Sequence, residues 1–237
     1  MQYHGGKSYI AKALVTTILS DTNKRDFWIE PFVGGGNVME HAAPHFQVSI
    51  GMDAHPDLIL MWNAAKSGIA PPLMTENLYR ELRHAKPSAL RGYAGFGCSF
   101  GGKWFGGWAA ERPEHNYAAG SMRVIHRQGL VFRDCNTTFV RCSFGSTTPP
   151  PGSVVYCDPP YVNTTGYSDS LDYDFFYRTL RKWTAQDSVC YVSGYDIPNA
   201  VPADMVWEGK QTVRAGRKKP GEKSKVRNER LYRIRDL

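Results

Sequence analysis

Residues 27–38, FWIEPFVGGGNV, begin a strand–turn–helix pattern that decides the fold. FWIE (27–30) has the composition of a short buried strand, PFVGGG (31–36) is a glycine-rich turn, and a helix is predicted from residue 37 to about residue 43. A second strand candidate, QVSIGMD (47–53), and a helix over about 56–67 follow. Strand, turn, helix and strand in this order predict a right-handed parallel crossover.

The same alternation of strands and helices returns in the second half of the chain. The strand candidates are TTFVRCSF (137–144), SVVYC (153–157) and SVCYVSG (188–194), and a helix is expected over about 173–184. The uninterrupted apolar run of SVVYC is typical of an inner strand in a parallel sheet. The sequence therefore predicts an α/β core, made of residues 1–55 and 131–237.

Residues 56–130 differ in character and are predicted to form an insert in this core. TENLYRELRHAK (75–86) and AGSMRVIHRQGL (119–130) have helical signals, and RGYAGFGCSFGGKWFGG (91–107) is expected to be a loop. Trp104, Phe105 and Trp108 could wedge into a base stack or pack this loop onto the core, and packing is favoured.

Composition and charge restrict the class of protein. The 237 residues are 42% hydrophobic and 22% charged, as in globular proteins, with no apolar run of membrane-spanning length and no secretory signal pattern. Five cysteines without a CxxC pair favour reduced thiols over disulfides or a zinc site, so a cytoplasmic location is expected and no metal is predicted. The segment 214–230, RAGRKKPGEKSKVRNER, has eight Lys and Arg against two Glu and accounts for most of the net charge of +7. Such a segment suits nucleic acid but equally a solvated hairpin.

The first candidate site combines the glycine turn with an acid. Gly34 and Gly36 allow close approach of a ligand at a strand-to-helix turn, and Asp53 ends the next strand 19 residues after Gly34. An acid at this spacing accepts hydrogen bonds from ribose hydroxyls in dinucleotide-binding folds. Met39 replaces the third glycine of that motif, which favours a nucleoside cofactor without a pyrophosphate over a dinucleotide. A tight turn without a ligand is the alternative.

The second candidate site is the motif Asp158-Pro159-Pro160-Tyr161 at the end of SVVYC. Ligands of open parallel sheets bind at the carboxyl ends of the strands. The prolines fix the backbone and offer no N–H, so the motif presents a carboxylate, carbonyl acceptors and an aromatic face. Such a set suits an amino group on an aromatic ring, as in a nucleobase.

These motifs together resemble the deoxyadenosine methyltransferase family of DNA adenine-N6 methyltransferases. The matching stretches are YHGGK (3–7), EPFVGGGNV (30–38), Asp53 and VVYCDPPY (154–161), in the order of the alpha group of amino-methyltransferases, with weaker likenesses at VSGYD (192–196) and NERLY (228–232). The resemblance implies a Rossmann-like, seven-stranded, mostly parallel sheet with helices on both faces. It implies S-adenosylmethionine as cofactor, bound by Tyr3, Lys7, Phe32, Gly34, Gly36, Asp53 and Asp158.

The resemblance also implies a reaction and a target. The substrate would be double-stranded DNA, with the adenine flipped out of the helix and methylated directly at Asp158, Pro159, Pro160 and Tyr161. The insert would recognise the target sequence. The candidate DNA-binding residues are basic and lie in three clusters, each of which could instead be an ordinary exposed face: Arg80, Arg83 and Lys86; Arg123 and Arg127; Lys218, Lys219 and Lys223.

Two other functions remain open from the sequence. A cytosine-N4 DNA methyltransferase would share the fold, but such enzymes more often have Ser in place of Asp158. A nucleic-acid-binding protein without catalysis would be free to lose Asp158 or Asp53, and both are present. The enzyme is expected to act as a monomer or a weak dimer.

Overall fold

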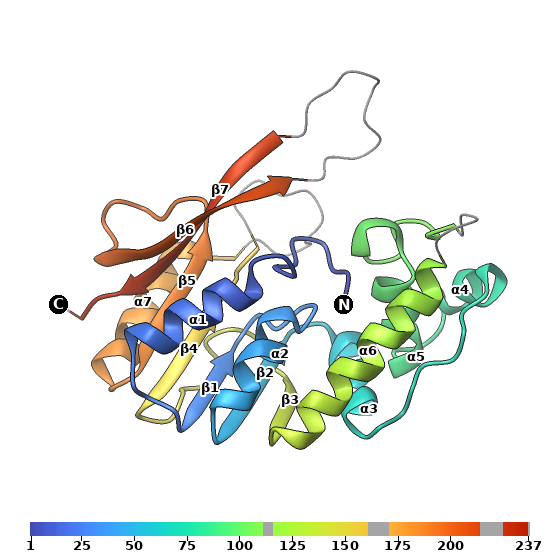
Figure 1. Cartoon of the computed structure of the whole chain (residues 1–237), viewed down its shortest axis with the longest axis horizontal. Coiled ribbons are helices and arrows are strands. Elements are labelled where there is room, and N and C mark those ends of the chain that lie inside the picture. The colour runs from blue at the N-terminus through green and yellow to red at the C-terminus, as the bar shows by residue number, and fades with distance from the viewer. Residues whose placement is uncertain (111–115, 161–170, 214–224, 237) are drawn as a thin grey trace.

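The computed structural model describes residues 1–110, 116–160, 171–213 and 225–236. Within them, seven strands form one sheet in the order β3-β2-β1-β4-β5-β7-β6 (Figure 1). The strands are β1 (Phe27–Glu30), β2 (Val48–Asp53), β3 (Thr137–Arg141), β4 (Ser153–Cys157), β5 (Val189–Gly194), β6 (Ala203–Val213) and β7 (Lys225–Ile234).

The sheet is mostly parallel, as the resemblance predicted. Parallel pairing joins β1 to β2 and β4, β2 to β3, and β4 to β5. Only β7 runs antiparallel among these described strands, and it lies between β5 and β6. The β6–β7 pair extends beyond the rest of the sheet (Figure 1), and the segment that connects its strands contains Lys218, Lys219 and Lys223, which lie outside the described residues.

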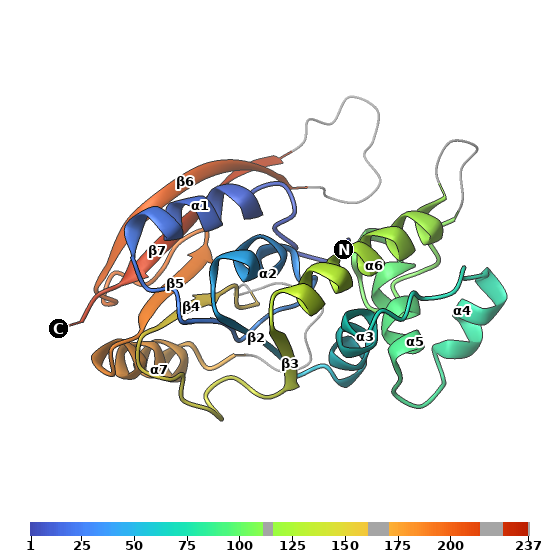
Figure 2. The ribbon, with the colours of Figure 1, turned by 60° about the horizontal axis from the view of Figure 1, so that its bottom comes forward.

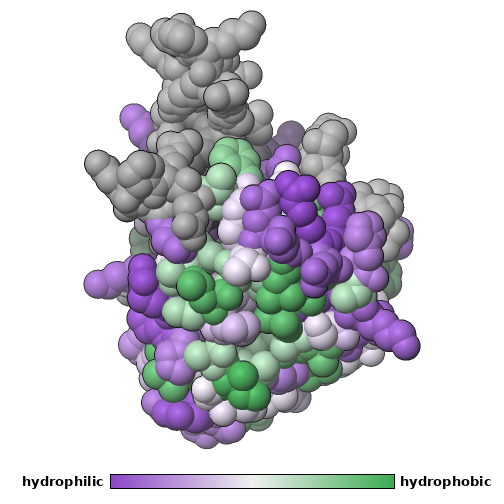
Figure 3. Space-filling model, turned by 90° about the vertical axis from the view of Figure 1, so that its right-hand side faces the viewer, coloured by the Kyte–Doolittle hydropathy of each residue, from purple (hydrophilic) through white to green (hydrophobic). Residues whose placement is uncertain are grey.

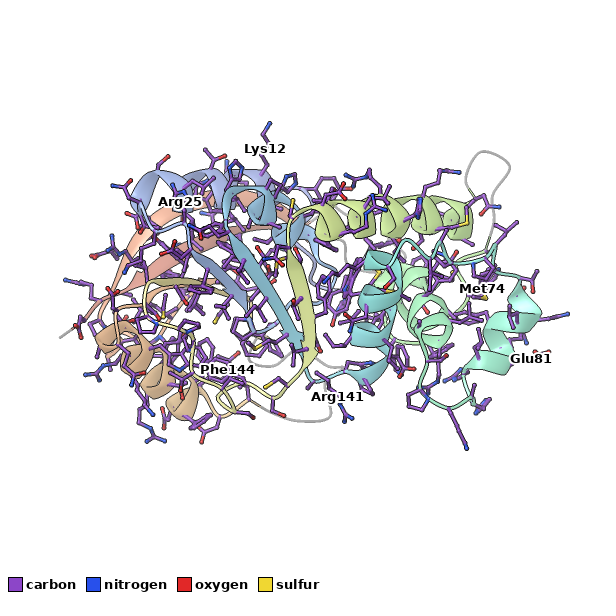
Figure 4. All side chains as sticks on the ribbon, turned by 90° about the horizontal axis from the view of Figure 1, so that it is seen from below. Lys12, Arg25, Met74, Glu81, Arg141 and Phe144 are labelled. Atoms are coloured by element: carbon purple, nitrogen blue, oxygen red, sulfur yellow. The ribbon has the colours of Figure 1, made fainter. Side chains whose placement is uncertain are left out.

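Helices cover both faces of the sheet. Helices α1 (Ala11–Asp21) and α2 (Asn37–Ala42) lie on one face and α7 (Tyr173–Ala185) on the other (Figure 2). The alternation of side chains along β1 explains why both faces need a cover: Trp28 packs in the cluster that includes α1 and α2, and Ile29 packs with α7. The sequence analysis predicted α2 and α7 within a residue of their bounds but missed α1. In Figure 4, Lys12 and Phe144 mark the two opposite sides.

A helical lobe lies beside the sheet and consists mostly of the predicted insert, with its last helix extending four residues beyond it. It contains α3 (Pro56–Lys66), α4 (Glu76–Leu82), α5 (Ala89–Gly92), a π-helical turn (Tyr93–Gly97), a 3-10 turn (Phe100–Gly102) and α6 (Tyr117–Asp134). Figures 1 and 4 show this lobe at one end of the molecule, where Met74 and Glu81 are labelled. Helices α3 and α6 pack against each other and against β3. The domain boundaries at residues 55 and 130 remain predictions.

Two predictions within the lobe were wrong. Residues 91–107 are not a plain loop, because they contain the end of α5 and both short helical turns. The glycines there allow close packing: a Cβ on Gly92 would lie 2.2 Å from the carbonyl oxygen of Asp57 on α3. Helix α4 ends at Leu82, short of the predicted residue 86, so Lys86 is not on the same helix as Arg80.

The outer face of the lobe has a polar and an apolar part. Figure 3 shows hydrophilic residues gathered in the upper half of this face, toward the side from which the β6–β7 pair extends, and hydrophobic residues below them. Exposed apolar side chains within the lobe include Leu60, Ile69 and Leu73. None of the helices in the described ranges has the length and apolar character of a membrane span.

Candidate active site

The predicted site residues come together at one edge of the sheet. The glycine turn follows β1, Asp53 ends β2, and Asp158 follows β4. Because β2, β1 and β4 are parallel neighbours, their carboxyl ends meet at the same edge. The chain leaves β1 toward β2 on one side and later returns to β4 on the other side, so this edge is the topological switch point, where open α/β sheets bind ligands.

Asp53 is oriented by the backbone around it. Its Oδ2 accepts a hydrogen bond from the N–H of Gly34 at 3.2 Å, and its Oδ1 accepts one from the N–H of His55 at 2.9 Å. Desolvation raises the pKa of Asp53 above its ordinary value, although the backbone hydrogen bonds act in the opposite direction. The carboxyl group is thus held beside the glycine turn, where it could accept hydrogen bonds from a ribose.

The glycine turn is closely covered by aromatic side chains. Gly34 has φ +44°, and a Cβ there would lie 2.9 Å from Cε1 of Tyr3. The indole N–H of Trp62 donates to the carbonyl oxygen of Gly34 at 2.9 Å. Gly36 has φ +65°, which side-chain-bearing residues rarely adopt. The chain's own aromatic side chains thus close over the turn, and the Asp53 carboxyl fixed beside it is an acceptor that fits the ribose of S-adenosylmethionine.

The remaining predicted cofactor residues lie at different distances from this turn. Tyr3 covers it, as just described, and packs with its ring centroid 5.2 Å from that of Phe96 in the lobe. Phe32 is directed to the α7 side, where it stacks on Phe144 at 5.3 Å. Lys7 contacts Asp158.

Asp158 lies in a polar cluster that sequence analysis did not foresee. Its Oδ1 accepts hydrogen bonds from the ammonium of Lys7 at 2.8 Å and from the hydroxyl of Ser193 at 3.2 Å. The hydroxyl groups of Ser193 and Tyr156 are 2.8 Å apart. Lys7 also lies 3.4 Å from a carboxylate oxygen of Glu229 on β7. Two donors on one oxygen fix the orientation of the Asp158 carboxylate.

Burial sets the charges in this cluster. Side-chain exposure is 2% for Lys7, 0% for Glu229 and 20% for Asp158, so the cluster opens to the surface at Asp158. Burial alone would lower the pKa of Lys7, but Asp158 and Glu229 together raise it above its ordinary value. Lys7 is therefore an ammonium. Burial raises the pKa of the nearby Glu30 well above its ordinary value, against the effect of a hydrogen bond from Trp28.

The two prolines after Asp158 are fixed by burial and by a contact with α7. Pro159 is buried, and the carbonyl oxygen of Pro160 accepts a hydrogen bond from the hydroxyl of Tyr173. Neither proline has an N–H, so this part of the motif offers acceptors only. Tyr161, the fourth residue of the predicted catalytic motif, lies outside the described residues.

The predicted DNA-binding residues that the structure describes lie on the lobe and do not form one cluster. Arg80 pairs with Glu76 on α4 at 2.6 Å, and Arg127 on α6 pairs with Glu40 of α2. All five of the described candidates are exposed: Arg80, Arg83, Lys86, Arg123 and Arg127.

The glycine- and aromatic-rich segment of the lobe contacts the N-terminal motif. The N–H of His4 donates to the carbonyl oxygen of Gly102 at 3.2 Å, and a Cβ on Gly102 would lie 2.6 Å from Cα of Tyr3. Trp104 and Trp108 are half-buried and Phe105 is buried, with aromatic contacts to Phe96 and Tyr79. The favoured prediction, that these rings pack, agrees with these contacts.

The sequence analysis assigned no role to three residues of this cluster, although they lie in stretches that it named: Tyr156, Ser193 and Glu229. Only Glu229 left a usable signal. It precedes Leu231 by two residues in a strand, and side chains two apart share a face. The buried Leu231 therefore indicates that Glu229 points into the protein as well.

The sheet order and the residues at its switch point define the Rossmann-like fold of S-adenosylmethionine-dependent methyltransferases. Residues 3–94 match the sequence model of the family described as D12 class N6 adenine-specific DNA methyltransferase. This stretch of the chain is similar to that family, in agreement with the predicted resemblance. The family implies S-adenosylmethionine as cofactor. The matched range ends before Asp158.

Solved structures give a weaker likeness. A precorrin-6y C5,15-methyltransferase from Geobacter metallireducens aligns with a TM-score of 0.44 at 7% identity, over 95% of this chain and 87% of that one. A putative RNA methyltransferase from Pyrococcus horikoshii aligns with a TM-score of 0.44 at 8% identity, over 96% and 81%. A putative methyltransferase from Escherichia coli aligns with a TM-score of 0.40 at 10% identity, over 99% and 92%. No curated protein matches the chain. Among the described residues, no group of three or more His, Cys, Asp or Glu could hold a metal ion.

Proposed function

We propose that this protein transfers a methyl group from S-adenosylmethionine to N6 of an adenine that is flipped out of double-stranded DNA. One observation supports this most strongly: Asp158 stands at the switch point beside the glycine turn and Asp53. An acceptor group for an amine and a binding turn for a nucleoside cofactor are then neighbours. When bound, the cofactor supplies a methyl group activated on a sulfonium.

The residues after β4 act on the base. The adenine amine is a poor nucleophile because its lone pair is delocalised into the ring. The Asp158 carboxylate and the Pro159 carbonyl oxygen accept hydrogen bonds from its two N–H groups and draw the nitrogen out of conjugation. Acceptors placed where positive charge develops stabilise the transition state. Holding the reacting atoms in line contributes roughly 7–11 kcal/mol.

The cofactor is assigned to the other side of the switch point. Gly34 and Gly36 allow its close approach, Tyr3 covers the turn, and Asp53 accepts hydrogen bonds from its ribose. The existing bonds from Gly34 and His55 to Asp53 support this role, because they orient the carboxyl group before any ligand arrives. Lys7 acts mainly on Asp158, to which it is bonded.

DNA is assigned to the side from which the β6–β7 pair extends. The hydrophilic half of the lobe in Figure 3 lies toward that side, and basic residues follow β6 in the sequence. Phosphate contacts of Lys218, Lys219 and Lys223 and base contacts from the insert 56–130 are part of the proposal. Flipping the adenine costs a few kcal/mol, which contacts with the DNA backbone offset.

The test is transfer of labelled methyl groups from S-adenosylmethionine to unmethylated double-stranded DNA, followed by mass spectrometry of the nucleosides. The proposal expects N6-methyladenine. N4-methylcytosine would assign the cytosine enzyme instead. Binding of DNA without any transfer, by protein that also binds the cofactor, would favour a non-catalytic protein.

A further inference from the structure

Glu229 is a buried acid within the most basic part of the sequence. It lies in β7, opposite Gly209 of β6, and has no exposed surface. Its neighbour two residues on, Leu231, packs in the core on the α1 side of the sheet. Glu229 therefore faces the start of α1, where the carbonyl oxygen of Lys7 accepts hydrogen bonds from Ile10 and Ala11.

The ammonium of Lys7 is surrounded by acceptors. It lies 2.8 Å from Oδ1 of Asp158, 3.3 Å from the carbonyl oxygen of Gly5 and 3.4 Å from Oε1 of Glu229. A lysine ammonium has three N–H donors in a fixed arrangement, so acceptors on several sides define both its place and its orientation. Along the chain, Asp158 is 151 residues from Lys7 and Gly5 is 2 residues from it. Glu229 lies on β7, so the ammonium contacts three separate segments.

The contact between Lys7 and Glu229 is made at the cost of burying the Glu229 carboxyl group. A single carboxylate would balance the charge of Lys7, yet the fully buried Glu229 lies beside it in addition to the partly exposed Asp158. Taking an ion out of water costs several kcal/mol before its partner is counted. The second acid therefore does more than neutralise Lys7.

We propose that Glu229 is a positioning residue for methyl transfer: it holds the Lys7 ammonium in place against Asp158, so that the Asp158 carboxylate keeps its orientation toward the base amine. This inference rests on the proposed function. Glu229 acts through Lys7 and does not touch the substrate. Replacing Glu229 is therefore expected to lower kcat and to change the affinities for cofactor and DNA little.

The first experiment compares Glu229→Gln with the wild type and with Glu208→Gln. Glu208 is a matched control because it also lies in the β6–β7 pair and binds an arginine, Arg230 at 2.7 Å, on the surface. A misplaced catalytic group can cost about a hundredfold, so kcat for Glu229→Gln is expected about 10- to 100-fold lower, with KM within about threefold. Glu208→Gln is expected to match the wild type. Should Glu229→Gln fail to fold, Glu229→Asp keeps the charge, draws the carboxylate back and is expected to lower kcat less.

A second measurement separates positioning from a merely structural role. Glu229 is one of the two acids that raise the pKa of Lys7, and the other is Asp158. Glu30 on β1 and Tyr156 on β4 interact electrostatically with Asp158, and burial raises the pKa of both. Without the charge of Glu229 the pKa of Lys7 falls. The alkaline limb of the kcat profile is then expected at lower pH in Glu229→Gln than in the wild type.

The third measurement is a double-mutant cycle with Lys7→Met. If Glu229 acts through Lys7, adding Glu229→Gln to Lys7→Met lowers kcat no further. An equal loss in both backgrounds overturns the inference, as does wild-type kcat in Glu229→Gln, or in Glu229→Asp if that variant is used. A wild type that methylates no adenine overturns the proposed function and this inference with it. A wild type that methylates adenine beside a fully active Glu229→Gln overturns this inference alone.

Discussion

The ammonium of Lys7 lies 2.8 Å from Oδ1 of Asp158, although 151 residues separate them in the chain. This contact joins the N-terminal YHGGK motif to the Asp-Pro-Pro motif after β4. Two motifs that the sequence analysis assigned to different tasks, cofactor binding and catalysis, thus share one buried cluster. The contact also fixes the acid on which the proposed reaction depends.

Replacing Asp158 by Ala is expected to stop methyl transfer while cofactor binding falls less. The substitution removes the acceptor for the base amine but leaves the glycine turn and Asp53 in place. Loss of one such group in other enzymes costs about 10²–10³-fold in kcat, and a loss at least this large is expected here. Single-turnover kinetics and calorimetric titration of the cofactor measure the two effects. Near-wild-type turnover would show that Asp158 is not the acceptor.

Replacing Gly34 by Ala tests the close cover of the cofactor turn. A Cβ at Gly34 would lie 2.9 Å from the ring of Tyr3, in addition to the strain of its positive φ. Gly68 is the control, because it also has a positive φ, +84°, and a Cβ there meets nothing closer than 3.9 Å. Both variants should lose about 1–2 kcal/mol of stability from backbone strain.

Only Gly34→Ala is expected to weaken cofactor binding, because only there does the added methyl group press on Tyr3. Urea denaturation and cofactor titration of both variants measure the two effects. Equal cofactor affinity in the two variants would contradict the assignment of the turn.

The pH dependence of cofactor binding should reflect the ionisation of the Asp53 carboxyl group. Desolvation raises the pKa of Asp53 in the free protein, and ribose hydroxyls donate best to the ionised carboxylate. Affinity is therefore expected to fall as pH is lowered through this raised pKa, and to be constant above it. In Asp53→Asn this part of the dependence should disappear. Identical pH profiles for Asp53→Asn and the wild type would exclude Asp53 as the titrating group.

The packing of α5 against α3 within the lobe should depend on Arg91. Arg91 lies 2.8 Å from Oδ2 of Asp57, which is 1% exposed and also accepts a hydrogen bond from the N–H of Ser88. Removing one partner of a buried pair costs about 3–5 kcal/mol, because the other charge stays buried. Arg91→Gln is therefore expected to destabilise the protein by about this amount.

Arg80→Gln is the matched control for this pair. Arg80 and Glu76 are 73% and 46% exposed, and such a helical pair contributes about 0.3–0.5 kcal/mol. Denaturation midpoints of the two variants would decide the matter. A loss for Arg91→Gln no larger than for Arg80→Gln would show that the pair does not hold α5 against α3.

Sequence patterns predicted the core of the fold because its strands are short and apolar and its turns are rich in glycine. They gave β1 and β4 with the observed bounds, and the meeting of Asp53, Gly34 and Asp158 at one edge followed from parallel topology alone. Helix α1 was missed because two threonines and several β-branched residues interrupt its helical signal.

The failures have a common physical cause: contacts between distant segments decided the outcome. Gly92 reads as a turn residue, but its missing side chain lets α5 approach α3. Glu229 reads as part of a solvated basic segment, but pairing of β7 with β5 and β6 carries it into the core. Local composition shows neither effect, and only the two-residue spacing of Glu229 from Leu231 in the strand points to the second.

The most direct test of the central claim is identification of the methylated base. Unmethylated DNA is incubated with S-adenosylmethionine and either the wild type or Asp158→Ala, and its nucleosides are analysed by mass spectrometry. N6-methyladenine with the wild type and none with Asp158→Ala is the predicted result. Methylated cytosine, or N6-methyladenine formed equally by both proteins, would contradict the account.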